Sequence, residues 1–356
     1  LTGGTAAGVV DTLDLSSKTA ALDFRVDATA STVPGIVGSY VGLETITGNG
    51  VAGSKVTRVN NTTTAWAVNN LGQIVVNSVA YANVSTIVGG IGSDTLTGPS
   101  LASGVATWTV NAANGGTLSI PSVATIAFSG VDGLTGGTGD DAFEILPAGS
   151  LSGLLNGGTG TGFNSLSYAQ WTTGVTVNLS VATAANSTAV AGVTSNIQMV
   201  TGGSGNDTLR GSTSKAAVLV GLAGNDTLVG GSQRDLLIGG TGADLLQSAN
   251  GDDLLISGRT AFDTNWDALK AIHSEWTSAR TFAQRTSNIW GNGTGTRNNG
   301  AYFFNSNPAD AITDTVFADT DADSLTGGLN QDWFFASVND LTDFVGTGTA
   351  PDRLDN

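Results

Sequence analysis

The chain contains no cysteine, which excludes disulfides and thiolate metal sites. Histidine occurs once, at His273, so the H-E-x-x-H motif of zinc proteases, which needs two histidines, is excluded. Long apolar runs are missing too, since none approaches the roughly 18 residues of a membrane-spanning helix. We therefore expect no membrane span and no fold stapled by disulfides.

Positive charge is also scarce, with 13 Lys and Arg against 29 Asp and Glu and a net charge of −16. This balance disfavours nucleic-acid binding, because phosphates would be repelled. Glutamate occurs only at Glu44, Glu144 and Glu275, so 26 of the 29 acidic residues are aspartate. Aspartate favours turns, and its carboxylate oxygens are the ligands that calcium prefers.

Glycine is abundant, with 51 residues, and 40% of the chain is apolar. That apolar content is too high for a disordered tail, so the composition indicates a β-rich chain with glycine turns. The chain begins Leu1-Thr2-Gly3-Gly4, within a motif and without a basic leader, so we expect residue 1 to be a processed or excised end.

A repeat of nine residues is the clearest pattern. Residues 202–210 read GGSGNDTLR, which fits G-G-x-G-x-D-x-U-x with U a large apolar residue, and related units begin at 221, 230, 239 and 248. The last three residues of a unit predict a short strand with its middle side chain inward, and the first six predict a glycine turn. Two units would make one coil of a parallel β-roll.

Equivalent turns should then stack every eighteen residues. Asp226 would face Asp244, and Asp235 would face Asp253. A calcium ion between two such turns would neutralise carboxylates that otherwise repel each other. A glycine-rich β-solenoid without metal is the alternative, but it gives no reason for an aspartate at the sixth position of each nine-residue unit.

Residues 202–256 resemble the RTX (hemolysin-type) calcium-binding nonapeptide repeats. The resemblance implies several structural Ca²⁺ ions and folding outside the cell after secretion. In this phase the candidate calcium ligands are Gly203, Gly205, Asp207, Gly224, Asp226, Gly231, Asp235, Gly240, Gly242, Asp244, Gly251 and Asp253.

Isolated copies of the pattern occur outside this run. Residues 89–96 read GGIGSDTL, residues 136–143 read GGTGDDAF, and residues 327–334 read GGLNQDWF. In phase with them, the further candidate ligands are Asp94, Asp132, Asp141, Asp323 and Asp332. The alternative at these positions is a solenoid corner that binds no metal.

Residues 1–200 carry longer, degenerate repeats, in which Trp66 and Trp108 begin two related units of about 45 residues. We interpret these tryptophans as core residues. The fold class expected is all-β: a parallel β-roll or β-solenoid, with irregular β repeats before it and one amphipathic helix after it. We divide the chain into degenerate solenoid repeats (1–200), the calcium roll (201–258) and a C-terminal cap (259–356).

The helix is predicted over about 265–289, where Leu269, Ile272 and Trp276 recur at helical spacing. Such a helix would cover the open apolar end of the roll, as caps do in repeat proteins. The segment that follows, up to the final nonapeptide pair, resembles the C-terminal region of large surface RTX-type proteins of planctomycete-like bacteria.

No catalytic constellation is apparent, because His273 stands alone and no G-x-S-x-G elbow is present. The sequence favours a non-enzymatic, secreted calcium-binding protein of a cell-surface fibre, layer or matrix, assembling end to end as a homo-oligomer or filament. Cell-surface polysaccharide and other matrix proteins are candidate partners. The alternative is the C-terminal secretion and folding module of a larger RTX adhesin or exoenzyme.

Overall fold

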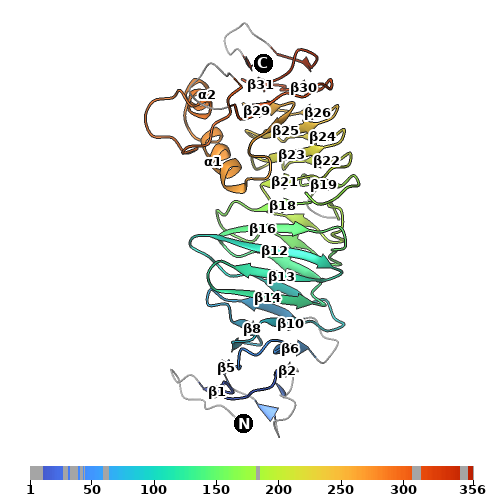
Figure 1. The fold of residues 1–356 in the computed structure, drawn as a ribbon, viewed down its shortest axis with the longest axis vertical. Coiled ribbons are helices and arrows are strands. Elements are labelled where there is room, and N and C mark those ends of the chain that lie inside the picture. The colour runs from blue at the N-terminus through green and yellow to red at the C-terminus, as the bar shows by residue number, and fades with distance from the viewer. Residues whose placement is uncertain are drawn as a thin grey trace. The chain divides into compact units, whose positions relative to one another are not determined.

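The structure is a computed structural model of residues 1–356. It describes residues 11–26, 31–32, 39–40, 43, 45–58, 64–181, 185–306, 314–344 and 352–355. The chain divides into two compact units: unit 1 is residues 1–164 with 189–196, and unit 2 is residues 165–188 with 197–356. Figure 1 shows strands stacked in layers within each unit and both helices in unit 2.

Unit 1 consists of two sheets whose strands are mostly parallel. In hydrogen-bonded order, the first sheet contains β1 (Thr12–Asp14), β5 (Thr45–Thr47), β9 (Val79–Ala82), β8 (Ile74–Val76), β7 (Ala65–Val68), β11 (Thr95–Thr97), β15 (Gly133–Thr135), β17 (Leu155–Asn156) and β20 (Thr194–Ser195). The second contains β16 (Asp140–Ile145), β12 (Val105–Ala112), β13 (Gly115–Ile120), β14 (Ala124–Ser129), β10 (Thr86–Val88), β6 (Lys55–Arg58), β2 (Asp23–Val26), β3 (Ser31–Thr32) and β4 (Ser39–Tyr40).

The two tryptophan units predicted from the sequence are antiparallel excursions from this parallel stack. Trp66 lies on β7, which continues antiparallel into β8 and β9. Trp108 lies on β12, which continues in the same way into β13 and β14. Both indoles are almost fully buried, as expected for core residues.

Unit 2 is a parallel β-roll made of two sheets. The covered sheet contains β18 (Ser165–Ser167), β21 (Met199–Thr201), β23 (Val218–Ala223), β25 (Leu236–Thr241), β27 (Leu254–Ile256), β31 (Trp333–Phe335) and β33 (Arg353–Asp355). The open sheet contains β19 (Thr176–Asn178), β22 (Thr208–Arg210), β24 (Thr227–Val229), β26 (Leu245–Gln247), β30 (Ser324–Thr326) and β32 (Leu341–Thr342). The mostly β fold with a parallel roll is therefore as the repeats predict.

The two sheets of the roll differ in their outer faces, and the sequence of their strands explains why. Strands of the open sheet such as β24 alternate, with only the middle residue fully buried. Strands of the covered sheet such as β27 (LLI) and β31 (WFF) are buried throughout. A strand that is apolar on both faces needs a second layer over it. The helices supply that layer.

The predicted single helix is wrong in one respect, because the segment forms two helices, α1 (Trp266–Trp276) and α2 (Phe282–Trp290). Asn265 caps α1 and accepts a bond from the Ala268 N–H. A second start signal separates the helices: Thr281 and Gln284 form a capping box, which favours a new N-terminus. Gly291, at φ 102°, ends α2.

The prediction that the helix covers the end of the roll is wrong. The helices lie beside the roll. They belong to a long excursion between β27 and β30, with a stem formed by β28 (Arg259–Thr260) and β29 (Val316–Phe317). After the excursion the roll resumes, since β26 pairs with β30 and β27 with β31. Within the described residues, no helix has the length and hydropathy that a membrane crossing requires. The proposed three-part division at 200 and 258 stays a prediction.

Candidate calcium-binding columns

The aspartates of the roll stack in two columns, one along each edge where the chain passes between the sheets. Strand β24 pairs in register with β26, and β25 with β27, so equivalent turns lie directly above one another. The Asp226 N–H donates to Asp244 Oδ1 at 2.7 Å, and the Asp235 N–H donates to Asp253 Oδ1 at 2.7 Å. The eighteen-residue period of the sequence therefore brings together the two pairs that it predicts.

The first aspartate column lies at the edge where the chain leaves the covered sheet. Each backbone N–H in it donates to the carboxylate of the next turn. Asp207 is nineteen residues from Asp226, as the longer unit between them requires, whereas Asp244 is seventy-nine residues from Asp323. The excursion is thus inserted into the column without breaking it. The members of this column are Asp207, Asp226, Asp244, Asp323 and Asp340.

The second aspartate column lies at the opposite edge. It begins where the Ala217 N–H donates to Asp235 Oδ1 at 2.7 Å. The Asp253 N–H donates to Asp332 Oδ1 at 2.8 Å, again across seventy-nine residues. The members of this column are Asp235, Asp253, Asp332 and Asp352.

In both columns the second carboxylate oxygen has too few donors. Oδ2 of Asp226, Asp244 and Asp323 in the first column has no hydrogen-bond partner, and neither has Oδ2 of Asp253 in the second. These side chains are at most 3% exposed. A buried carboxylate oxygen without a donor is costly unless a cation neutralises it. The residues therefore fit a metal ion in the columns.

Backbone oxygens converge on the same places. A Cβ placed on Gly221 would lie 2.2 Å from Asp226 Oδ2 and 2.4 Å from the Gly239 carbonyl oxygen. A Cβ on Gly239 would lie 2.5 Å from Asp244 Oδ2 and 2.3 Å from the Ser257 carbonyl oxygen. Only glycine leaves this space open. A carboxylate and carbonyls of successive turns make an all-oxygen set, which suits Ca²⁺.

Each candidate calcium site has few carboxylate ligands. Among the described residues, no three acidic, histidine or cysteine side chains gather around one point. A bound ion would therefore take most of its ligands from the backbone, with the aspartates supplying the negative charge. When bound, calcium would neutralise the paired carboxylates and fix the turns between strands that the chain's own hydrogen bonds join.

At the N-terminal end of the columns the chain supplies donors itself. Asp207 Oδ2 accepts from the Gly203 N–H at 2.6 Å, and Asp207 Oδ1 accepts from the Val175 N–H at 2.7 Å. Asp235 Oδ2 likewise accepts from the Gly231 N–H. The first aspartate of each column therefore has donors for both carboxylate oxygens, and it needs a cation less than the aspartates of the later turns.

The glycines predicted as ligands form the turns of these columns. Four of them have positive φ, which other residues rarely adopt: Gly224, Gly240, Gly242 and Gly251. At Gly203 and Gly231 a Cβ would instead lie within 2.3 Å of a carbonyl oxygen of the preceding coil. Gly205 is equally crowded, with the Gly174 nitrogen at 2.4 Å from a Cβ. Their role as carbonyl ligands stays a prediction.

Burial raises the pKa of these aspartates in the metal-free protein, and for Asp226, Asp244 and Asp253 carboxylates of neighbouring turns raise it further. The pKa of Asp226 rises to about 7 and that of Asp244 to about 8. In the second column the pKa of Asp235 rises to about 6 and that of Asp253 to about 9, while hydrogen bonds from the backbone act in the opposite direction. The columns thus hold negative charge only at a cost, which a divalent cation would remove.

Unit 1 contains the remaining predicted ligands, in turns that are already hydrogen-bonded. Asp132 Oδ2 accepts from the Asp94 N–H at 2.7 Å, and its Oδ1 accepts from the Asn114 Nδ2 at 2.8 Å and from the Ser152 hydroxyl. Asp94 Oδ2 accepts from the Gly90 N–H, and its Oδ1 has no partner. The structure brings Asp94 and Asp132 together, a pairing that the sequence did not predict, but Asp132 has little capacity left for a cation.

Asp141 shows the same completion more clearly. Its Oδ1 accepts from Trp108 Nε1 at 2.9 Å and its Oδ2 from the Gly137 N–H at 3.0 Å. The residue in the next turn is Asn164, whose Oδ1 accepts from the Asp141 N–H at 2.9 Å. An amide thus occupies the place of the second carboxylate, so this geometry lends no support to calcium at Asp141.

Sequence reasoning missed two members of the columns. The Asp323 N–H donates to Asp340 Oδ1 at 3.1 Å, and the Asp332 N–H donates to Asp352 Oδ1 at 2.9 Å. Asp340 and Asp352 lie seventeen and twenty residues beyond their partners, and no glycine pair precedes them. The only signal was their place in the final acidic segment.

Comparison with known families agrees with this geometry. The model of the RTX calcium-binding nonapeptide repeat matches four copies, in residues 199–214, 218–259 and 309–338. A search of curated proteins finds no significant match. The matched segments contain Asp207, Asp226, Asp235, Asp244, Asp253, Asp323 and Asp332. Repeats of this family bind several structural Ca²⁺ ions, and the proteins that carry them are typically secreted. The chain therefore contains RTX calcium-binding nonapeptide repeats.

Proposed function

We propose that this chain is a secreted structural protein whose β-roll is stabilised by Ca²⁺ in the two aspartate columns. One observation carries the proposal: four buried carboxylate oxygens of the columns lack any donor, although the surrounding turns are well hydrogen-bonded. Calcium at millimolar concentration outside cells would complete these turns. The ligands proposed are the column aspartates together with carbonyls of the glycine turns.

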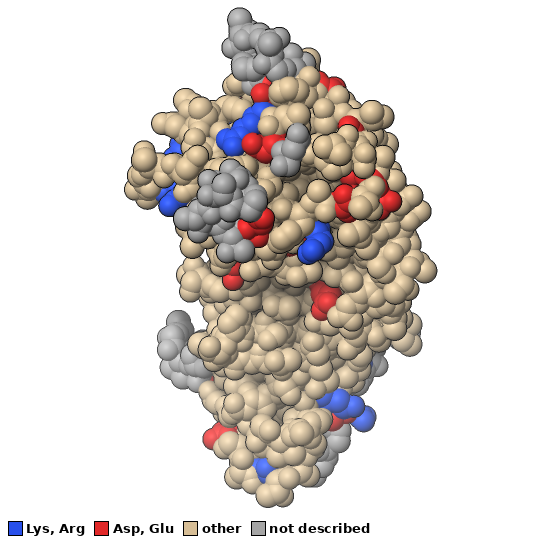
Figure 2. All heavy atoms as spheres, turned by 45° about the horizontal axis from the view of Figure 1, so that its top comes forward, with Lys and Arg blue, Asp and Glu red and all other residues tan. Residues whose placement is uncertain are grey.

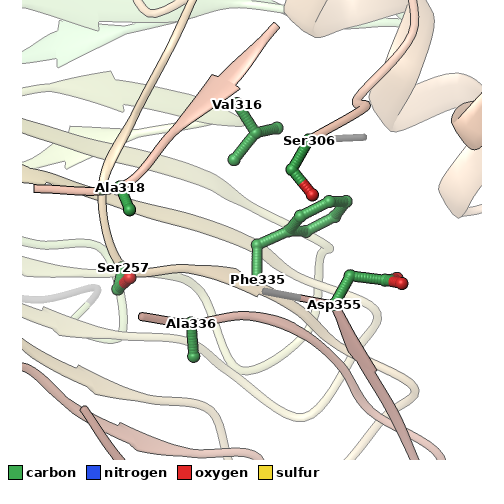
Figure 3. A pocket seen from close by; sticks show the side chains of 8 residues that line it. Ser257, Ser306, Val316, Ala318, Phe335, Ala336 and Asp355 are labelled. Atoms are coloured by element: carbon green, nitrogen blue, oxygen red, sulfur yellow. The ribbon is translucent and has the colours of Figure 1, made fainter. Parts of the chain in front are cut away.

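We propose a structural role and not a catalytic one. His273 is buried, hydrogen-bonded to the backbone of Ala216, and its burial lowers its pKa to about 4, which suits packing. The cavity in Figure 3, between Val316, Phe335 and Asp355, measures about 30 Å³, which is room for little more than water. A cleft of about 360 Å³ beside α2 is lined by no carboxylate or histidine.

The surface is consistent with a matrix component. Figure 2 shows a face that is mostly uncharged, with scattered acidic and basic side chains. Seven aspartates of the columns are buried and add nothing to this surface: Asp207, Asp226, Asp235, Asp244, Asp253, Asp323 and Asp332. Adhesion to cell-surface polysaccharide or to other matrix proteins is part of the proposal.

End-to-end association is the finer proposal. Among the described residues of unit 2, β32 and β33 are the last strands of their sheets, and the proposal is that their outer edges pair with another chain. Apolar side chains are exposed at this end, with Val338 at 90% and Leu341 at 72%. Residues 1–10, which the proposal would place at the other contact surface, lie outside the described residues.

Light scattering of the chain in millimolar calcium, and then in chelator, tests the assembly. Calcium-dependent particles larger than the monomer would support a fibre or layer. A strictly monomeric, calcium-stabilised chain would instead favour the alternative, a secretion and folding module of a larger RTX adhesin or exoenzyme. A chain that takes up no calcium at all would refute the structural role itself.

A further inference from the structure

The two aspartate columns have different neighbours. In each turn the residue just before the ligand position faces outward. In the first column these residues are Asn206 and Asn225, which form a ladder: the Asn225 N–H donates to Asn206 Oδ1 at 2.9 Å, and the Ala243 N–H donates to Asn225 Oδ1 at 3.1 Å. In the first three turns of the second column the corresponding residues are Ala216, Arg234 and Asp252, and they contact the helical layer, defined as residues 266–290.

Three successive turns of the second column make this contact. The backbone of Ala216 is hydrogen-bonded to His273 on α1. Arg234 Nη1 donates to the carbonyl oxygen of Ser278, between the helices, at 2.8 Å. Asp252 Oδ2 accepts from Arg285 Nη2 on α2. The contacts repeat with the coil, so they form a seam along the second column.

The ion pair in the middle of the seam is buried on the helical side. The Arg285 side chain is 1% exposed and that of Asp252 is 19% exposed. Arg285 also donates to the Trp276 carbonyl oxygen at 3.0 Å, and its guanidinium lies 4.8 Å from the Trp276 ring centroid. Arg234 Nε lies 3.5 Å from Asp252 Oδ2, so two coils share this carboxylate. A buried guanidinium without its carboxylate would be strongly unfavourable.

The seam continues into the covered sheet. Trp333 directly follows the ligand position at Asp332, and its ring centroid lies 6.0 Å from that of Trp276 and 6.4 Å from that of Trp290. Arg353, on the last strand, lies over both Trp290 and Trp333, at 4.7 and 4.6 Å from their centroids. Every turn of the second column is therefore followed or preceded by a residue that holds the helical layer.

We infer that Arg234, Asp252 and Arg285 are positioning residues of the second aspartate column, which couple its calcium sites to docking of the helical layer. Asp253 and Asp235 fix the spacing of two coils through one hydrogen bond, and Arg234 and Asp252 are their chain neighbours. Calcium between these coils therefore sets the geometry that Arg285 requires. By linkage, docking of the helices raises the calcium affinity of this column by the same factor.

The inference rests on the proposed calcium binding, and its test separates the two. Hydrogen exchange of residues 266–290 in the full chain is measured as free calcium is raised, with calcium uptake followed by calorimetry. The key variant is Asp252→Asn, which removes the negative charge that pairs with Arg285 and keeps Asp253. Its matched control is Asn225→Ala, at the same repeat position beside Asp226 in the first column.

In the wild type, protection of the helices should rise with calcium uptake. Asp252→Asn should shift the midpoint of that protection to calcium concentrations about fivefold higher or more, which is the lower range of usual coupling between sites. Asn225→Ala should shift it less than about twofold, because the first column does not hold the helices. Arg285→Gln should reproduce the shift, and Arg285→Lys should restore part of it because it keeps the charge.

Three results would overturn the inference. Helices that stay fully protected in chelator, while calcium binds with normal affinity, would show that docking and binding are independent. An unshifted midpoint in a folded Asp252→Asn protein would do the same. Equal shifts in Asp252→Asn and Asn225→Ala would show a general loss of stability without column specificity. If the wild type takes up no calcium, the proposed function fails instead.

Discussion

The turn at Asp141 in unit 1 and the turn at Asp244 in unit 2 both follow the nonapeptide pattern. They differ in the hydrogen-bond donors to the carboxylate and in the residue that stacks on it. Both carboxylate oxygens of Asp141 have donors, and the next turn supplies the amide of Asn164. Asp244 Oδ1 accepts from Asp226, its Oδ2 has no donor, and the next turn supplies a second carboxylate, Asp323. The donors that reach the carboxylate and the residue stacked on it together decide whether a cation is needed.

Removal of calcium should produce the largest difference between the two units. In chelator the strands of unit 2 should lose protection from hydrogen exchange, while β12 to β14 of unit 1 stay protected. Each ion bound at a hundred times its Kd contributes about 2.7 kcal/mol to the folded state, and several ions add. Peptide-resolved hydrogen exchange checks this. Equal protection of unit 2 with and without calcium would contradict it.

Asp244→Ala should have the next largest effect. Loss of one ligand should lower calcium affinity and the melting temperature together, with a cost of about 3 kcal/mol in millimolar calcium for the loss of one well-occupied site. In chelator the same substitution should cost little, because it removes a buried carboxylate. Thermal melts with paired calorimetry measure both. Asp141→Asn is the control, since its cost should be the same with and without calcium.

Asn164→Asp should convert a turn of unit 1 toward the unit 2 type. The new carboxylate would face Asp141 in the adjacent turn and would lose the donation from Asn164 Nδ2 to the Asn196 carbonyl oxygen. We expect a loss of about 1–3 kcal/mol in chelator, the usual cost of an unsatisfied buried group. Calcium should recover part of that loss. A variant with no response to calcium would show that the neighbour alone does not create a site.

The stability of the calcium-free chain should also depend on pH. The folded-state pKa values of Asp226, Asp244 and Asp253 rise to about 7, 8 and 9, because of burial and then of neighbouring carboxylates. The folded state therefore binds more protons than the unfolded state between about pH 4 and these values, so stability falls as pH rises through this window. Calcium-free unit 2 should melt higher at pH 5 than at pH 8, and calcium should reverse that order.

The repeat period was sufficient to predict the roll and the aspartate pairs, because each coil contacts only its neighbours. Asp340 and Asp352 could not be found in this way, since their spacings of seventeen and twenty residues fall outside the period. The continuation of the columns across the excursion also depends on strand pairing seventy-nine residues apart, which no local pattern shows.

The sequence of the strands, and not that of the helices, indicates where the helices lie. Strand β25 begins with LLI, and strands β27 and β31 read LLI and WFF, which indicates a sheet that is buried on both faces. Strands such as β24, with one apolar residue toward the core, indicate an open face. The apolar stripe of α1 therefore had a matching sheet, and a cap on the end was not needed.

The most direct test is a crystal structure of the chain grown in millimolar calcium, with anomalous scattering used to locate the ions. The account predicts ions between Asp226 and Asp244 and between Asp235 and Asp253, each held by carboxylate and carbonyl oxygens, and none between Asp141 and Asn164. Columns without ions, with the aspartates bonded to each other or to water, would contradict it.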